Sequence, residues 1–556
     1  ASSVPTAVPS SMPAPTLAPT VNSTPSSAPS AVIGPGSQTP TPGPYEQPPA
    51  GLSPTSASLD QVLALFKQGM GTAVKPVQTR REVDQINAYG LTGIYTEADA
   101  GNDFIETTQL GPTVTESGES NGQKWAMNEN GLVRLISGVH QEDVVTEQAV
   151  SDVVLGHPSD AVRLVGQVES PVAAYVIEVH PQGGRHEWYF IERATGRLVR
   201  IEQAEIDERA VTTFDDFRTT DGLIEAWHGH RSGVFPKNDV DWRITSLQFN
   251  GQVSPQELAI PRSRSDMVFP AAASSVRLPA RFDDSDIIVR VVINGRGLDF
   301  ELDSGASSIV VDRDVVRQLG LQTFGESTQS VAGTFDQSSA IVPEMHIGDL
   351  TMRNVVVDSL PFNYQEDEST RVVGLLGYDF LASIVAKVDY EHETVDAFDP
   401  ASFAQPSGQL FQLPMALDDS VPMVGAAVGG GVGKAFAVDT GSPFVIVFPA
   451  FASAHQAEFQ DVKIQEGREE IVPIIEASGV GGAIDLIPTT VSVFHFGAVG
   501  FEKFLVFQVL AAPSFEGEDT DGLVGYEFLQ YFTVFFDYRD GLLLLQPNSL
   551  LTNPNG

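Results

Sequence analysis

Two short segments contain the side chains best suited to acid–base chemistry. The first is Asp303-Ser304-Gly305-Ala306, and the second is Asp439-Thr440-Gly441-Ser442. One carboxylate can deprotonate a water molecule while one carboxylic acid protonates a carbonyl oxygen. Two negative charges about 4 Å apart repel by roughly 4 kcal/mol at an effective dielectric near 20, so a close pair of aspartates keeps one proton over a wide acidic range. We therefore expect Asp303 and Asp439 to act as one catalytic pair.

The segments that must position these aspartates form an internal repeat. Residues 287–293, an Asn294-Gly295 turn and residues 298–302 precede the first triad, and Asn-Gly between apolar runs indicates a hairpin. Residues 424–428, a glycine-rich turn and residues 435–438 precede the second. Each triad is followed by a short apolar run and later by a similar octet, at 374–381 and 522–529. The matching order predicts two duplicated lobes, at 270–400 and 401–556.

The two triads and the two octets resemble those of aspartic peptidases, particularly the retropepsin-like branch. The resemblance covers about the last half of the chain and implies a mainly β, bilobal acid-protease fold with pseudo-twofold symmetry. It implies an endopeptidase that cuts peptide or protein substrates without a cofactor or metal. Retropepsins pair two identical chains, whereas the duplication here places both lobes in one chain, so we expect activity as a monomer. By resemblance, Ser304 and Thr440 brace the opposite loop, Gly305 and Gly441 leave room for water and substrate, and Ala306 and Ser442 complete the loops.

The family also closes a β-hairpin flap over its substrate. Flexible segments between triad and octet provide two candidates. They are Ala332, Gly333 and Thr334 in the first lobe, and Gly479, Val480 and Gly481 in the second. Neither contains the tyrosine that pepsin-like flaps carry, and a plain surface hairpin explains each segment equally well.

The chain before the repeat divides into two parts. Residues 1–56 are rich in Ser, Thr, Pro and Ala, a composition that predicts a disordered stalk of the kind found on exported proteins. Residues 57–269 predict an α+β domain, with a helix capped by Ser58 and an antiparallel meander. The prolines in residues 259–286 indicate a linker between this domain and the repeat. Its order of elements resembles the lipoprotein-carrier-like (LolA-like) curved sheets of bacterial envelopes. His228 and His230 share a strand face, but no third ligand is evident, so we expect a surface strand and no metal site.

Composition excludes several functions. The chain has 556 residues, with 72 acidic and 32 basic residues and a formal net charge of −40. Such a surface repels nucleic acid and anionic membranes. Cysteine is absent, which excludes disulfides, thiolate zinc sites and cysteine nucleophiles. No apolar run is long enough to span a bilayer. The stalk and the carrier-like resemblance lead us to expect an exported protein, made with a signal peptide, in the periplasm, at the cell surface or outside the cell. The start at Ala1 indicates a processed or trimmed form.

Two alternatives stay open at this stage. The chain could be a non-catalytic protein that binds a peptide in the same groove, or an apolar ligand in its first domain. Alternatively, the two lobes could pair between chains. The second alternative is disfavoured because a covalently linked lobe has a high effective concentration.

Overall fold

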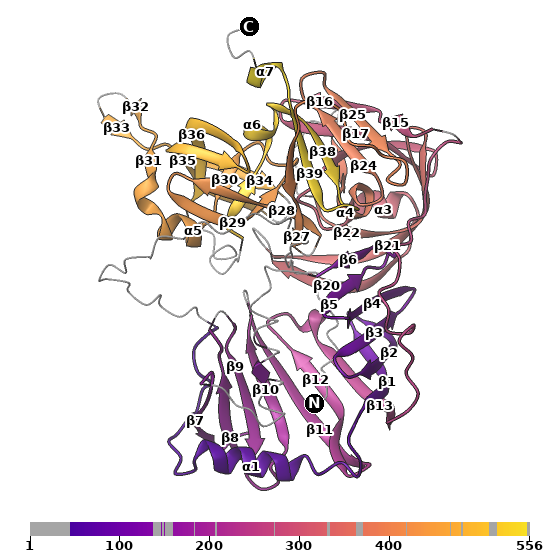
Figure 1. The fold of residues 1–556 in the computed structure, drawn as a ribbon, viewed down its shortest axis with the longest axis vertical. Coiled ribbons are helices and arrows are strands. Elements are labelled where there is room, and N and C mark those ends of the chain that lie inside the picture. Colours follow the sequence, from indigo (N-terminus) through magenta and orange to yellow (C-terminus); the bar gives the residue numbers. More distant parts are fainter. Residues whose placement is uncertain are drawn as a thin grey trace, which may run out of the picture.

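The computed structural model (Figure 1) shows a first domain joined to two β-rich lobes. The fold is mainly β, as the sequence predicts. The described residues are 45–136, 146, 149–150, 160–182, 184–205, 208–271, 273–330, 334–362, 371–418, 420–466, 469–479, 482–510 and 520–552.

The first domain is a single antiparallel sheet of thirteen strands that curves around helix α1 (Leu59–Gly69) at one end (Figure 1). The strand order is β6-β5-β4-β3-β2-β1-β13-β12-β11-β10-β9-β8-β7. The elements are β1 (Thr79–Ala88), β2 (Leu91–Ala100), β3 (Asp103–Leu110), β4 (Thr113–Ser120), β5 (Gln123–Met127), β6 (Val133–Leu135), β7 (Val162–Val168), β8 (Ala174–Val179), β9 (Glu187–Glu192), β10 (Leu198–Ala204), β11 (Arg209–Thr220), β12 (Leu223–Ser232), the 3-10 helix η1 (Pro236–Asn238) and β13 (Val240–Phe249).

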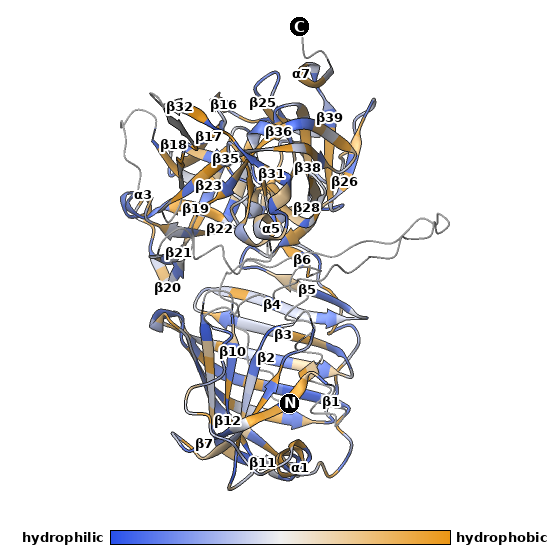
Figure 2. Ribbon diagram, turned by 90° about the vertical axis from the view of Figure 1, so that its left-hand side faces the viewer, coloured by the Kyte–Doolittle hydropathy of each residue, from blue (hydrophilic) through white to orange (hydrophobic). Residues whose placement is uncertain are grey.

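Local sequence explains helix α1 and where it packs. Ser58 caps it, since its side chain accepts from Gln61 N while the Gln61 side chain accepts from Ser58 N. Val62 is fully buried in a cluster with Ile177 of β8 and Ile191 of β9. Alternating hydropathy along the strands is visible in Figure 2, as expected for a sheet with two different faces.

One face of β1 carries a buried charged cluster. Arg80, Glu82 and Asp84 alternate with exposed or half-buried residues and are themselves buried. Arg80 Nη1 binds Glu97 Oε2 at 2.8 Å, and Arg80 also pairs with Glu82. Burial raises the pKa of Glu82 to about 9, against the opposing charge of Arg80, and burial likewise raises the pKa of Asp84 to about 7. Carboxyl groups therefore outnumber the cation that could balance them, and the folded domain retains protons here.

Part of the segment that the sequence assigns to the disordered stalk contacts the first domain. Residues 45–56, assigned to the disordered stalk, lie against the first domain. Arg209 donates to the carbonyl oxygens of Tyr45 and Gln47, and Ser53 forms an isolated β-bridge with Gln167. The backbone groups of Tyr45, Gln47 and Ser53 thus have hydrogen-bond partners in the first domain, which composition alone does not predict. The rest of the expected stalk, residues 1–44, lies outside the described residues.

The first lobe is a nine-stranded sheet with two short helices. Its order is β14-β22-β19-β23-β18-β17-β21-β20, with β16 paired to β17. The elements are β14 (Met267–Val268), β15 (Ser275–Arg277), β16 (Ala280–Asp283), β17 (Asp286–Ile293), β18 (Arg296–Leu302), β19 (Ile309–Asp312), α3 (Arg313–Gln318), β20 (Thr323–Ser330), β21 (Thr334–Ile347), β22 (Leu350–Leu360), β23 (Val372–Leu376), α4 (Tyr378–Leu381), β24 (Val385–Asp389) and β25 (Thr394–Phe398).

The second lobe repeats this arrangement. Its nine-stranded sheet has the order β27-β28-β29-β37-β30-β36-β35-β31, with β34 paired to β35. The elements are β26 (Phe411–Pro414), β27 (Ala416–Asp418), β28 (Val421–Val428), β29 (Gly431–Val438), β30 (Val445–Val447), α5 (Pro449–Ala454), the 3-10 helix η2 (Gln456–Glu458), β31 (Phe459–Asp461), β32 (Ile464–Glu466), β33 (Glu469–Ile471), β34 (Ile475–Gly479), β35 (Gly482–Phe496), β36 (Val499–Val509), β37 (Gly522–Val524), α6 (Tyr526–Leu529), β38 (Phe532–Asp537), β39 (Leu542–Pro547) and α7 (Ser549–Thr552).

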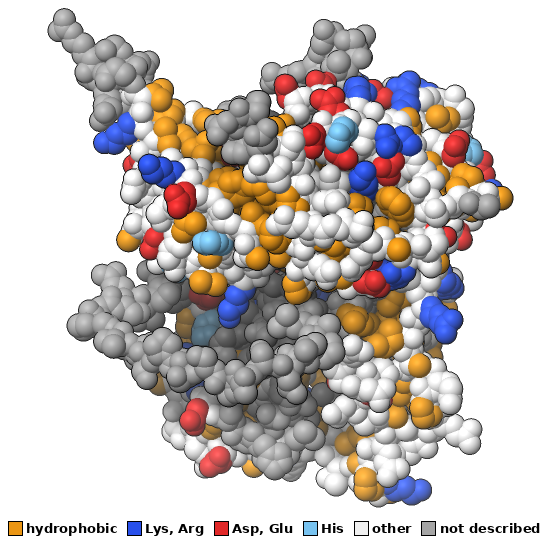
Figure 3. Space-filling model, turned by 45° about the horizontal axis from the view of Figure 1, so that its top comes forward, with side chains coloured by type: hydrophobic (Ala, Val, Ile, Leu, Met, Phe, Trp, Pro, Cys, Tyr) orange, Lys and Arg blue, Asp and Glu red, His pale blue; other side chains and the backbone are white. Residues whose placement is uncertain are grey.

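A shared sheet joins the lobes. Its order is β15-β25-β24-β38-β39-β26, so strands of the first lobe pair directly with strands of the second (Figure 1). The central pair is β24–β38, in which Val388 faces Val534. One continuous apolar core includes Phe300 and Phe380 of the first lobe and Phe436 and Phe528 of the second. The face of the lobes that is turned toward the viewer in Figure 3 carries both acidic and basic side chains.

The connection between the first domain and the lobes is partly built into the lobes. The sequence assigns residues 259–286 to a linker and starts the first lobe at 270. In the structure β14 pairs with β22, β15 with β25 and β16 with β17, so the lobe begins at Met267. The prolines that suggested a linker separate these short strands instead of preventing them.

Hydrogen bonds fix the first domain to the first lobe. Asn130 Nδ2 donates to Val356 O (2.9 Å), and Val356 N donates to Asn130 Oδ1 (2.8 Å). At a second contact, Asn238 forms the same reciprocal pair with the backbone of Thr328, both bonds measuring 2.8 Å. Glu326 N also donates to Tyr89 O at 2.8 Å. The second contact therefore holds β20, the outer strand of the first candidate flap.

Candidate active site at the seam of the two lobes

Equivalent hairpins of the two lobes lead into the two triads, which lie where the lobes meet. β17 and β18 pair through the turn Asn294-Gly295, where both residues have positive φ (51° and 72°). Asn and Gly tolerate this conformation, and β18 then runs directly into Asp303. β28 and β29 form the corresponding hairpin, which leads into Asp439. Each aspartate N–H donates to the neighbouring octet strand, Asp303 to Leu376 O (3.2 Å) and Asp439 to Val524 O (3.0 Å).

The two carboxyl groups converge on opposite glycines. A Cβ atom placed on Gly305 would lie 2.8 Å from Asp439 Cγ, and one placed on Gly441 would lie 2.9 Å from Asp303 Cγ. Each aspartate also accepts from the glycine of its own loop, Asp303 Oδ1 from Gly305 N (2.8 Å) and Asp439 Oδ1 from Gly441 N (2.9 Å). Glycine at both positions is therefore a requirement of close approach and not only of turn formation.

Crossed hydrogen bonds lock the two loops together. Thr440 Oγ1 donates to Leu302 O (2.6 Å) and accepts from Ser304 N (3.0 Å). In mirror fashion, Ser304 Oγ donates to Val438 O (2.6 Å) and accepts from Thr440 N (3.0 Å). Both hydroxyl residues are buried. Their side chains thus fix the separation of the aspartates from within one chain.

The electrostatics of the pair favour a shared proton. Burial, the charge of Asp439 and the charge of Glu301 raise the pKa of Asp303 well above its usual value. Burial also raises the pKa of Asp439, although hydrogen bonds from Gly441 N and Asp303 oppose this effect. Two carboxyl groups in contact titrate as a unit, so the acid and the base are properties of the pair.

The remaining loop residues close the turns. Ala306 N donates to Asp303 O (3.3 Å), and Ala306 O accepts from Tyr378 N (3.0 Å). Ser442 O accepts from Tyr526 N (2.8 Å), while Ser442 Oγ accepts from Phe444 N (3.3 Å). Each loop is therefore tied to the short helix of its own octet.

An acidic residue in each octet supports the loop, and sequence reasoning missed this role. Asp379 Oδ2 accepts from Ile309 N (3.1 Å), just after the first triad, and Asp379 Oδ1 accepts from Asn128 Nδ2 of the first domain (2.8 Å). Burial raises the pKa of Asp379 to about 6. Glu527 accepts from Val445 N in the equivalent place, and burial raises its pKa to about 7. The available signal was the acid in the sixth position of both octets.

The candidate flaps lie at the ends of long hairpins. Thr334 pairs with Ser330 at the end of β20–β21, and Gly479 pairs with Gly482 at the end of β34–β35. Ala332, Gly333, Val480 and Gly481 lie outside the described residues. The hairpin context therefore agrees with the expectation, while flap function stays a prediction.

The two histidines of β12 have carboxylate partners. His228 Nδ1 lies 2.8 Å from Asp215 Oδ1, and His228 Nε2 lies 2.8 Å from Asp241 Oδ2. Partial burial opposes protonation, but these two hydrogen bonds raise the pKa of His228. Within the described part of the chain, no cluster of three or more His, Asp or Glu side chains has the arrangement of a metal site.

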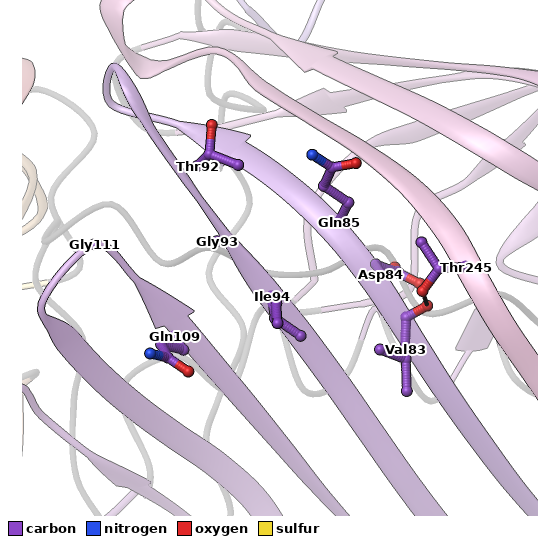
Figure 4. A pocket seen from close by; sticks show the side chains of 9 residues that line it. All are labelled: Val83, Asp84, Gln85, Thr92, Gly93, Ile94, Gln109, Gly111 and Thr245. Carbon is purple, nitrogen blue, oxygen red and sulfur yellow. Dashed lines mark hydrogen bonds between the residues drawn. The ribbon is translucent and has the colours of Figure 1, made fainter.

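Two cavities lie away from the aspartates. One, of about 510 Å³, is formed by β1, β2, β3 and β13 of the first domain, with Gln85, Ile94 and Gln109 at its wall (Figure 4). The other, of about 960 Å³, lies between the first domain, the connection and the lobes, beside Tyr378 and Tyr538. Neither contains Asp303 or Asp439. Among the described helices, none is long and apolar enough to cross a membrane.

One protein-family model matches part of the first lobe. The family model described as aspartyl protease matches residues 289–380, which include the first triad and most of the first octet. This segment is therefore an aspartic-protease-like region. No curated protein matches the sequence.

Solved structures give weak similarities. They include an aspartic proteinase from Irpex lacteus (15% identity, 51% of this chain and 100% of that chain, TM-score 0.32) and the Basic 7S globulin from soybean (12%, 50% and 96%, TM-score 0.32). A third is a DUF1329 family protein from Desulfovibrio piger ATCC 29098 (15% identity, 36% of this chain and 94% of that chain, TM-score 0.27).

Proposed function

We propose that this chain is an aspartic endopeptidase of the retropepsin-like type, with both lobes in one chain. The observation that carries the proposal is the crossed hydrogen bonding of Ser304 and Thr440, which holds the two half-buried aspartates against opposite glycines. The aspartyl protease match to residues 289–380 supports it.

The reaction follows from a pair that holds one proton. The ionised carboxyl removes a proton from a water molecule, whose oxygen attacks the carbonyl carbon of the peptide bond. The protonated carboxyl gives its proton to the carbonyl oxygen, forming a neutral tetrahedral intermediate. Breakdown returns the hydroxyl proton to the pair and transfers a proton to the leaving amine, so the pair ends with the single proton it began with.

The pKa values set the direction of the pH dependence. Because burial raises the pKa of both Asp303 and Asp439, the singly protonated pair extends to higher pH than for solvent-exposed aspartates. Activity should fall on the acid side when the pair gains its second proton, and on the alkaline side when the pair loses its only proton.

The test is cleavage of an unstructured protein between about pH 3 and 7 by the wild type, Asp303→Asn and Asp439→Asn. Each substitution should lower kcat/KM by at least about 10²-fold. Asp461→Asn, on the exposed strand β31, is the matched control and should retain activity. Full activity in either dyad variant would refute the proposal, and tight peptide binding without cleavage by the wild type would favour a non-catalytic groove.

Mixing the two inactive variants tests whether lobes pair between chains. In an exchanged dimer, one of the two sites would combine an intact Asp303 with an intact Asp439, and activity would return. In the single-chain arrangement every site carries one substitution. We therefore expect no recovery on mixing.

A further inference from the structure

Glu301 lies on the same side of β18 as the catalytic pair. Successive residues of a strand point to opposite faces, so Glu301 and Asp303 share one face while Phe300 and Leu302 enter the core. Glu301 is half-buried, and its charge acts on both Asp303 and Asp439. Its carboxyl group therefore belongs to the surroundings of the dyad.

The neighbours of Glu301 leave its carboxyl group uncompensated. Across the sheet it is paired with Ile288 of β17 and Leu375 of β23, which are both buried and apolar. The titratable groups that act on it are Asp286 of β17 and Asp439, both acidic. In the described part of the chain, no cation pairs with Glu301 and no donor binds it. Burial, Asp286 and Asp439 together raise the pKa of Glu301 to about 8.

The equivalent face of the second lobe is apolar. Register places Ala437 of β29 opposite Met423 of β28 and Leu523 of β37, as Glu301 lies opposite Ile288 and Leu375. Val421 lies two residues before Met423, as Asp286 lies two residues before Ile288 in the first lobe. Val421, Met423 and Ala437 form one buried cluster with Leu523 packed against it. The pseudo-twofold axis thus relates an acidic face to an apolar one.

We propose that Glu301 is a specificity-determining residue, which selects peptides with a lysine or arginine beside the scissile bond on the first-lobe side and an apolar residue on the second-lobe side. This inference rests on the proposed endopeptidase function. A peptide that crosses both lobes in an extended conformation sends its side chains alternately to either face, so the two residues flanking the cut meet chemically different walls.

A cationic side chain of the substrate would supply the positive charge that no group in the described residues provides beside Glu301. It places a positive charge among Glu301, Asp286 and Asp439, where an unpaired carboxylate is costly to bury. Binding of the cation requires Glu301 in its ionised form. Because the pKa of Glu301 in the free enzyme is raised to about 8, the preference for lysine should increase as pH rises from about 5 toward 8.

The experiment compares two fluorogenic peptides that differ only by lysine or norleucine at a residue flanking the cut, with each flanking position varied in turn. The wild type should prefer lysine at one position by about tenfold or more in kcat/KM, and norleucine at the other. Glu301→Gln, which keeps shape but not charge, should lose about tenfold of the lysine preference and its dependence on pH. Glu502→Gln, exposed on β36, is the matched control and should keep the wild-type ratio.

A binding measurement separates this inference from the proposed function. Peptide analogues with a reduced, uncleavable bond are titrated by calorimetry into the wild type and Glu301→Gln. Hydrolysis that fails while the lysine analogue still binds more tightly to the wild type than to the variant would overturn the catalytic proposal alone. Equal lysine preference in both proteins would overturn the role of Glu301, and no binding of either analogue would overturn both.

Discussion

Replacing Thr440 by valine should separate the positioning of the dyad from the general stability of the lobes. Valine preserves the shape of threonine but removes the hydroxyl, which donates to Leu302 O and accepts from Ser304 N. Thr440 is only 2% exposed, so water cannot replace these bonds without rearrangement. At about 1–3 kcal/mol for each buried group left unpaired, the unfolding free energy of the lobes should fall by about 2–6 kcal/mol.

Activity should fall further than stability alone explains. The lost bonds cross between the two loops, and a displacement of about 1 Å between reacting groups can cost about 10²-fold in rate. We expect kcat to decrease by about that factor. Thr489→Val is the matched control, because Thr489 is equally buried but donates only to Val506 O of its own lobe, at 3.2 Å. It should lose stability without a comparable loss of kcat.

The assays must report on the lobes themselves. All four tryptophans lie in the first domain, so their fluorescence is unsuitable. Calorimetry gives the unfolding transitions, and hydrogen exchange measured on peptides from β18 and β29 gives local stability. The reasoning fails if Thr440→Val and Thr489→Val lose similar stability while both retain the wild-type kcat.

Two further predictions address the close approach of the loops and the charge of the first domain. Gly441→Ala would place a Cβ atom 2.9 Å from Asp303 Cγ and should lower kcat by about 10²-fold. Gly425→Ala is the control and should keep the wild-type kcat, because its Cβ atom would meet nothing closer than 3.5 Å. Equal kinetics in the two variants would contradict the packing argument. Because Glu82 keeps a proton in the folded first domain that it releases in the unfolded chain, its contribution to the unfolding free energy should be fully present below about pH 4 and be lost as pH rises toward about 9. Urea titrations followed by tryptophan fluorescence should show a flatter decline in Glu82→Gln but an unchanged decline in the exposed Glu169→Gln, and the same slope in both would count against this origin.

Local signals predicted much of the fold. The Asn294-Gly295 turn fixed a hairpin because both residues tolerate positive φ. The cap at Ser58 predicted α1. The repeated order of triad and octet predicted two equivalent lobes, since duplicated segments repeat the same strand pairings. These features depend on neighbours along the chain, which sequence patterns report directly.

Other features depended on contacts between distant segments and were missed or misplaced. Composition assigned residues 45–56 to a stalk, yet Arg209 and Gln167 hold them. Proline suggested a linker before residue 270, yet β14 already pairs with β22 there. Export of the chain stays a prediction from composition.

By itself the sequence determined that this protein is mainly β, that its second half contains two copies of one lobe, and that each lobe carries one aspartate on a tight glycine loop. Only the tertiary structure decided the atoms that carry the bracing bonds of Ser304 and Thr440, the support from the octet acids Asp379 and Glu527, and the placing of Glu301 where the second lobe has the apolar Ala437. The physical reason is that burial and strand register depend on pairing between segments far apart in the sequence. Burial and register in turn set the charge interactions and the neighbours of each side chain, which local sequence patterns do not report.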